Sequence, residues 1–106
     1  MSLLKLVLSR MVEIEEERVR LEVDHLSQED DIEMMLVRLV CTHSNTDPTA
    51  LRPDMRLRID LGILPVDALD MFDAISNVHE IDPPVGAIRN ARTIEELVEI
   101  AADLET

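Results

Sequence analysis

Aromatic side chains are almost absent from this chain: Phe72 is the single aromatic residue among 106, although 46% of the residues are hydrophobic. The core must therefore be built from Leu, Ile, Val, Ala and the six Met residues. Leu, Ala and Met are strong helix formers, whereas strands draw on aromatic and β-branched residues. A chain of this length has room for one small domain with a compact core. We therefore predict an all-α fold.

The charge balance narrows the class of partner. Ten Lys and Arg residues stand against 23 Asp and Glu residues, which gives a formal net charge of −13. Nucleic acids and anionic membranes are bound by clustered Lys and Arg, so we expect neither and favour a partner with a basic surface. A single cysteine, Cys41, cannot form an internal disulfide, and no apolar run is long enough for a membrane span. Because a signal-peptide pattern is also missing, we predict a cytoplasmic protein.

Residues 1–26 are predicted to form an amphipathic extension ahead of a domain at 27–106. Apolar residues at three-four spacing, interrupted at Arg18, mark one face of a helix: Leu4, Val7, Met11, Ile14, Leu21 and His25. The alternation of Val19, Leu21 and Val23 fits a short strand instead. The stripe has three candidate partners, namely its own domain, a helix of another protein, or a second copy of the chain in a homodimer.

The first helix of the domain is predicted to precede a long loop. Ser27, followed three residues later by Asp30, suits a helix N-terminus before the apolar run 32–40. A cluster of turn formers at 42–48 should end this helix. The segment 47–64 is expected to be ordered but irregular. Apolar residues that could attach it to the core are Leu51, Met55, Leu57, Ile59 and Leu61.

Three further helices are predicted in the second half of the chain. Pro65 suits the first turn of a helix, where its missing N–H is not needed, and apolar positions at helical spacing continue to His79. Consecutive prolines at 83–84 must end that helix. A short helix at 85–90 follows, and Thr93 with Glu96 forms a capping-box pattern that opens the last helix.

This order of parts resembles the acyl carrier protein family from residue 30 to about residue 103. The shared features are a long helix, a long loop, Asp60-Leu61-Gly62 where the family signature begins, a helix-ending proline, a short helix, and Thr93-Ile94 opening the last helix. The resemblance implies an acyl-carrier-protein-like four-helix bundle, here with an extra N-terminal helix. In the family, a D-S-L motif follows the glycine, and its serine receives 4′-phosphopantetheine from coenzyme A.

The attachment serine of the family is missing from this chain, because no serine lies between Gly62 and Ile75. A gapless alignment puts Pro65 at the position of the serine, whereas an insertion would put Ala68 there. Attachment requires a hydroxyl oxygen that attacks phosphorus, and neither side chain provides a nucleophile. We therefore expect no cofactor. Proline and alanine both suit the start of a helix, so the departure affects the activity and not the fold.

The resemblance also implies a recognition surface on the second helix. In the family, acidic side chains of this helix contact basic patches on partner enzymes. The corresponding candidates here are Asp67, Asp70, Asp73 and Glu80, with Met71 expected to be exposed beside them as an adaptable apolar contact. The simpler interpretation is a solvated acidic face that the helix dipole favours near its N-terminus.

Other chemistry-bearing residues do not form a recognisable site. Cys41 and His43 lack further ligands at zinc-binding spacing, so a buried thiol at the end of a helix is the simpler interpretation. Acids such as Glu29, Asp30 and Asp31 point in different directions along a helix, and we assign no metal. We predict an interaction or regulatory module and not an enzyme. The alternative is a working acyl carrier that is modified at another position or has lost its serine by mutation.

Overall fold

The computed structural model describes residues 2–11 and 31–105, and their regular structure is helical. The described elements are a helix at residues 3–11, α2 (Ile32–Ser44), the 3-10 helix η1 (Pro48–Ala50), α3 (Pro65–Ser76), α4 (Val85–Asn90) and α5 (Ile94–Leu104). Within these two ranges no strand forms, and the β-type pairing is one isolated bridge between Arg56 and Thr93. The all-α prediction is therefore confirmed. Among the helices described, none combines the length and apolar character needed to cross a membrane.

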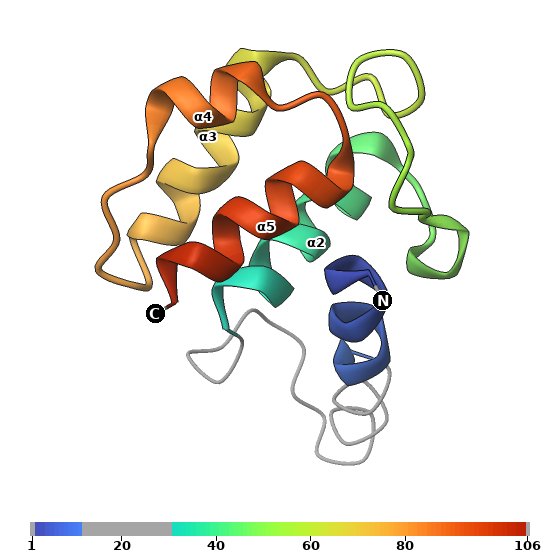
Figure 1. Ribbon diagram of the computed structural model, residues 1–106, viewed down its shortest axis with the longest axis horizontal. Helices are drawn as coiled ribbons and strands as arrows, with labels where there is room; N and C mark the ends of the chain where they lie inside the picture. The colour runs from blue at the N-terminus through green and yellow to red at the C-terminus, as the bar shows by residue number, and fades with distance from the viewer. Residues whose placement is uncertain (1, 12–30, 106) are drawn as a thin grey trace.

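The helices pack in two pairs joined through α2. In Figure 1, α5 lies across α2, while α3 and α4 lie together to one side, and α2 also contacts α3. The helix at residues 3–11 lies near α2 and α5 at the opposite side of the bundle. Three hydrogen bonds fix its start, because Ser2 Oγ and the N–H groups of Leu3 and Leu4 all donate to the Glu95 carboxylate of α5.

A single aliphatic core fills the space between these helices. Phe72 of α3 is fully buried, and its core cluster draws apolar side chains from every α-helix of the described ranges. Leu4, Val7 and Met11 belong to the same core. Packing against its own domain thus accounts for this part of the N-terminal stripe. The predicted stripe positions Ile14, Leu21 and His25, the interrupting Arg18 and the alternative strand at 19–23 lie outside the described residues.

The observed helix ends refine the predicted ones. The N-cap of α2 is Asp31, whose Oδ1 accepts a hydrogen bond from Met34 N at 2.8 Å, whereas Ser27 lies outside the described residues. As predicted, α3 begins at Pro65 and α4 covers 85–90. The prediction that the second helix reaches His79 is wrong, because α3 ends at Ser76. Its core-facing stripe already ends at Ile75, so burial does not favour another turn.

The last helix begins as the sequence predicts. Thr93 is the N-cap of α5 and its Oγ1 accepts from Glu96 N at 3.2 Å. The reciprocal half of the predicted capping box is shifted by one residue, because the Glu96 carboxylate accepts from Arg92 N and not from Thr93 N. The first interaction satisfies an N–H of the first helical turn, and the second fixes the residue that precedes the N-cap.

The loop between η1 and α3 is ordered by backbone bonds to the start of α5. Leu57 N donates to Arg92 O at 2.9 Å, and Ile94 N donates to Met55 O at 3.0 Å. The apolar attachments were predicted in part: Leu51, Leu57 and Leu61 are buried and Met55 is half-buried. The prediction fails at Ile59, which is 70% exposed because it lies in the turn that leads to Gly62, a glycine with φ of +66°.

Candidate functional site

The sequence resemblance predicts the attachment position at the start of α3, and this part of the helix offers no hydroxyl. Pro65 occupies the first turn and is exposed, whereas Ala68 is 1% exposed and packs in the core. The only hydroxyl of α3 belongs to Ser76 at the far end of the helix, where it donates to Asp73 O at 2.6 Å. Of the two candidate positions, only Pro65 is therefore presented to solvent.

The predicted acidic residues have different roles in the structure. Asp67 is half-buried; its Oδ2 accepts from Leu64 N at 2.9 Å and lies 3.5 Å from His43 Nε2, so it caps α3 and links it to α2. Asp70 and Asp73 are exposed, and neither carboxylate has an ion-pair partner in the described part of the chain. Glu80 is exposed but follows the end of α3, so the prediction that it lies on this helix is wrong.

The prediction that Met71 is exposed is wrong, because this side chain is 6% exposed and belongs to the core. The buried positions of α3 are residues 68, 71, 72 and 75, which is the three-four spacing of a single helix face. Met71 closes that stripe, so it lies on the face opposite to the solvated acids. The candidate partner surface of α3 therefore reduces to Asp70 and Asp73.

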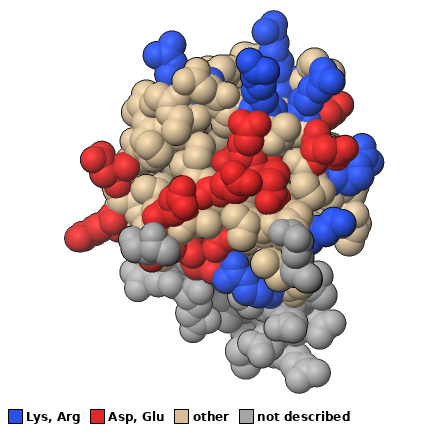
Figure 2. Space-filling model, viewed as in Figure 1, with Lys and Arg blue, Asp and Glu red and all other residues tan. Residues whose placement is uncertain are grey.

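A cavity of about 680 Å³ lies beside the start of α3. Buried side chains from the loop, α3 and α4 form its apolar wall, namely Leu57, Ile63, Ala68 and Ile88. Three arginines also line it: Arg56 and Arg58 from the loop, and Arg92 from the residues before α5. In Figure 2, basic side chains gather along the upper edge of the visible side of the molecule, above a band of Asp and Glu over α5. Residues at 56–58 and 88–92 meet only in the fold, so helical spacing could not reveal this cavity.

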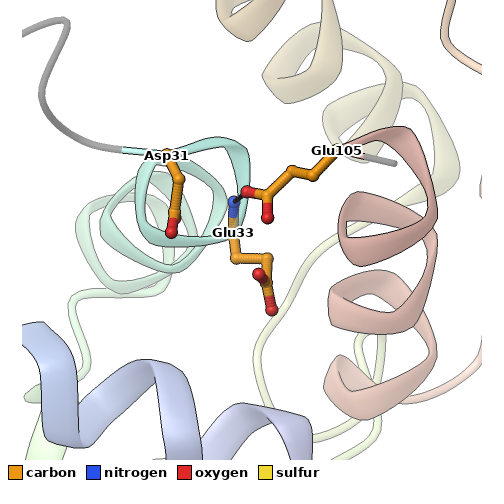
Figure 3. Close-up of side chains that lie close together, drawn as sticks. All are labelled: Asp31, Glu33 and Glu105. Atoms are coloured by element: carbon orange, nitrogen blue, oxygen red, sulfur yellow. Dashed lines mark hydrogen bonds between the residues drawn. The ribbon is translucent and has the colours of Figure 1, made fainter.

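A second feature absent from the sequence predictions is a carboxylate cluster. Asp31 and Glu33 at the start of α2 and Glu105 after α5 each place one carboxylate oxygen within 4.8 Å of the others (Figure 3). Glu105 Oε1 accepts from Glu33 N at 3.2 Å. Arg10 lies between the acids, because its guanidinium bonds Asp31 and, at 3.3 Å, Glu33. Such a cluster could attract a cation, but the guanidinium already neutralises part of its charge.

The electrostatics of this cluster centre on Glu33, which is buried. Burial raises the pKa of Glu33 from its ordinary value to about 7, and a hydrogen bond with Glu105 and repulsion from that carboxylate add to the effect. Arg10 opposes the shift. The cluster therefore joins three elements, the helix at 3–11, α2 and the end of α5. The protonation state of Glu33 sets the charge at this contact.

Cys41 and His43 form no metal site with other described residues. Cys41 is half-buried, and burial together with Asp47 raises the pKa of its thiol to about 11. Thiolate is the reactive form, so this thiol is unsuited to nucleophilic chemistry. The interpretation of Cys41 as a packing residue agrees with this environment.

Comparison with known proteins finds no match: no protein-family model, no curated protein and no solved structure is significantly similar to this chain. The resemblance to acyl carrier proteins thus rests on the order and spacing of the parts, with Asp60-Leu61-Gly62 and Thr93-Ile94 at the expected places in the sequence.

Proposed function

We propose that this chain is an acyl-carrier-protein-like interaction module that works without a prosthetic group, beside cytoplasmic enzymes of fatty-acid, polyketide or related thioester chemistry. The observation that carries the proposal is that Pro65, shortly after Asp60-Leu61-Gly62, opens α3 and is exposed to solvent. In the gapless alignment with the family, this place belongs to the serine that receives the arm. A short α4 and a Thr-capped α5 follow in the expected order.

The chemistry at Pro65 separates recognition from acyl transfer. A pyrrolidine ring cannot attack phosphorus, so no thioester can be held at this position. Recognition needs no covalent arm, because an exposed acidic helix can still contact a basic surface. Asp70 and Asp73 supply two exposed carboxylates one helical turn apart for such a contact.

Charge reversal on α3 tests the proposed partner surface. We expect that Asp70→Lys or Asp73→Lys in an immobilised chain abolishes the capture of proteins that wild-type chain retains from a cell extract, with quantification by mass spectrometry. Glu99→Lys is the matched control, because Glu99 is an exposed acid on α5 and the substitution changes the net charge equally. Unchanged capture by both α3 variants would contradict the proposal.

The alternative, a working carrier, is tested by the intact mass after incubation with coenzyme A and a broad-specificity phosphopantetheinyl transferase. We expect no added arm on the wild-type chain and a complete adduct on a serine-bearing carrier in the same reaction. An arm on the wild-type chain would overturn the proposal. Pro65→Ser restores the hydroxyl where the gapless alignment places it, so an adduct on this variant would add support to the family resemblance.

A further inference from the structure

We propose that the cavity beside α3 is a docking site for an acidic peptide segment of a partner protein, with one apolar side chain of that segment entering the cavity. This site is distinct from the acidic surface of α3. The cavity is lined by α3 only at Pro65 and Ala68, so Asp70 and Asp73 do not belong to it.

The backbone holds the arginines of the cavity together. The bridge between Arg56 and Thr93 joins the loop to the start of α5. Leu57 N donates to Arg92 O at 2.9 Å, which fixes Arg92 beside the loop residues that precede and follow Leu57. The position of the three guanidinium-bearing residues thus follows from backbone bonds and does not depend on a ligand.

The charge around the cavity runs against the charge of the whole chain. Arg56, Arg58 and Arg92 are exposed, and none of them has an ion pair within the described ranges, although the chain has a net charge of −13. One acid, Glu96, also lines the cavity, and its Oε2 accepts from Arg92 N at 3.0 Å. The cavity lining therefore carries two more positive than negative groups. Guanidinium groups without partners suit carboxylates, which they bind through paired hydrogen bonds.

The apolar surface indicates a peptide and not a small amphiphilic anion. A cavity of about 680 Å³ has room for one large apolar side chain, and a buried anchor of this kind supplies much of the energy of many interfaces. Exposed apolar surface lies both in the cavity and beside it, because Ile59, which lines the cavity, is 70% exposed, and Val66, next to Pro65 and outside the lining, is 58% exposed. A small anion inside the cavity would leave Val66 in water, whereas a peptide can cover Ile59 and Val66 together.

The test begins with random peptides displayed on phage and selected on the full chain. We expect enrichment of sequences with several Asp or Glu residues around one large apolar residue. A synthetic peptide from that pool should bind the Arg58→Gln and Arg92→Gln variants about tenfold more weakly, as expected for the loss of a charge-assisted hydrogen bond. Its affinity for the wild-type chain should also fall as the salt concentration rises.

Arg52→Gln is the matched control, because Arg52 is exposed, pairs with Asp54 and does not line the cavity. All three positions are exposed, so folding of the variants is expected and is checked by circular dichroism. Enrichment of peptides without acids, or equal binding by the Arg52, Arg58 and Arg92 variants, would overturn the proposal. Arginine-dependent binding of decanoate or decyl phosphate, with no enriched acidic peptide, would overturn it in favour of a small anion. Asp70→Lys leaves this cavity intact, so this result and the test of the α3 surface can fail separately.

Discussion

Glu33 carries a prediction about how the stability of the fold changes with pH. Its side chain is buried at the junction of the helix at 3–11, α2 and the end of α5 (Figure 3). Burial and the nearby Glu105 carboxylate raise the pKa of Glu33 from 4.5 to about 7, against the opposing effect of Arg10. In the folded protein, Glu33 thus keeps its proton at pH values where it would release it in the unfolded chain.

The sign follows from proton linkage. Between the unfolded pKa of 4.5 and the folded pKa of about 7, the folded state binds more protons at Glu33 than the unfolded state. The free energy of unfolding therefore decreases as the pH rises through this window. The protonated Glu33 carboxyl makes its full contribution to the free energy of unfolding below the unfolded pKa, and this contribution is lost as the pH rises through the folded pKa. Above the folded pKa, the ionised Glu33 carboxylate destabilises the folded state.

Glu33→Gln removes the ionisable group, and with it this destabilisation, and keeps the shape of the side chain. A shift from 4.5 to about 7 corresponds to a ceiling of about 3 kcal/mol, because each unit of pKa difference is worth about 1.4 kcal/mol. Glutamine forgoes the ion pair with Arg10, so we expect a gain in the free energy of unfolding of about 1–3 kcal/mol near pH 8. Near pH 4 the amide replaces a neutral carboxyl, and the gain should vanish.

Urea denaturation followed by circular dichroism at several pH values measures this difference. Glu99→Gln serves as the control, because it removes the same charge from an exposed position and should shift stability almost equally across the range. Carbon NMR titration of the Glu33 carboxyl gives an independent midpoint. A loss of stability in Glu33→Gln near pH 8, or a difference from wild type that does not change with pH, would refute the reasoning. It would mean that the ion pair with Arg10 outweighs burial.

Three further predictions concern the N-terminal helix and the thiol. Leu4→Ala should lower the free energy of unfolding by about 2–5 kcal/mol in urea denaturation because Leu4 is 0% exposed, whereas Leu6→Ala at 46% exposure should cost less than about 0.5 kcal/mol; similar values for both would refute core packing of this helix. Burial alone would raise the pKa of Glu95, but bonds from Leu3, Leu4 and Ser2 lower it. Glu95→Gln should therefore cost about 1 kcal/mol at neutral pH, and this difference should disappear as the pH falls through the lowered pKa of Glu95, which thermal unfolding can follow. Cys41 should react slowly with a disulfide reagent near pH 8 and at the normal rate in urea, because its thiol pKa is about 11; fast reaction of the folded chain would contradict this.

The parts of the fold that could be predicted are those that local chemistry determines. Pro65 and Thr93 mark helix starts because a missing N–H and a hydroxyl cap act within one turn of the chain. The scarcity of aromatic residues correctly indicated a helical core of aliphatic side chains, in which Phe72 is fully buried. Ile59 was predicted to be buried and is exposed, and Met71 was predicted to be exposed and is buried. Hydrophobicity alone does not determine which face of a turn or helix contacts the core.

The candidate site was less accessible from the sequence because it depends on distant residues. The cavity brings residues 56–58 together with 88–93, and the carboxylate cluster joins Glu33 to Glu105. Neither pairing leaves a spacing pattern in the sequence. The acidic residues of α3 were visible, but Asp67 looked equivalent to Asp70 until its bond to Leu64 N and its approach to His43 were known.

The helix at residues 3–11 changes how the chain can be divided. The apolar side chains of a separable extension would lie outside the core of the domain. Leu4, Val7 and Met11 instead lie in the same core as side chains of α2 and α5. Glu95 of α5 binds N–H groups at the start of this helix, and Arg10 near its described end binds the acids at the start of α2. Removing the helix would thus leave core side chains without packing and the carboxylates of Asp31 and Glu33 without the Arg10 guanidinium. The buried side chains of this stripe are already covered within the chain, so a homodimer through the N-terminal segment would have to use other residues.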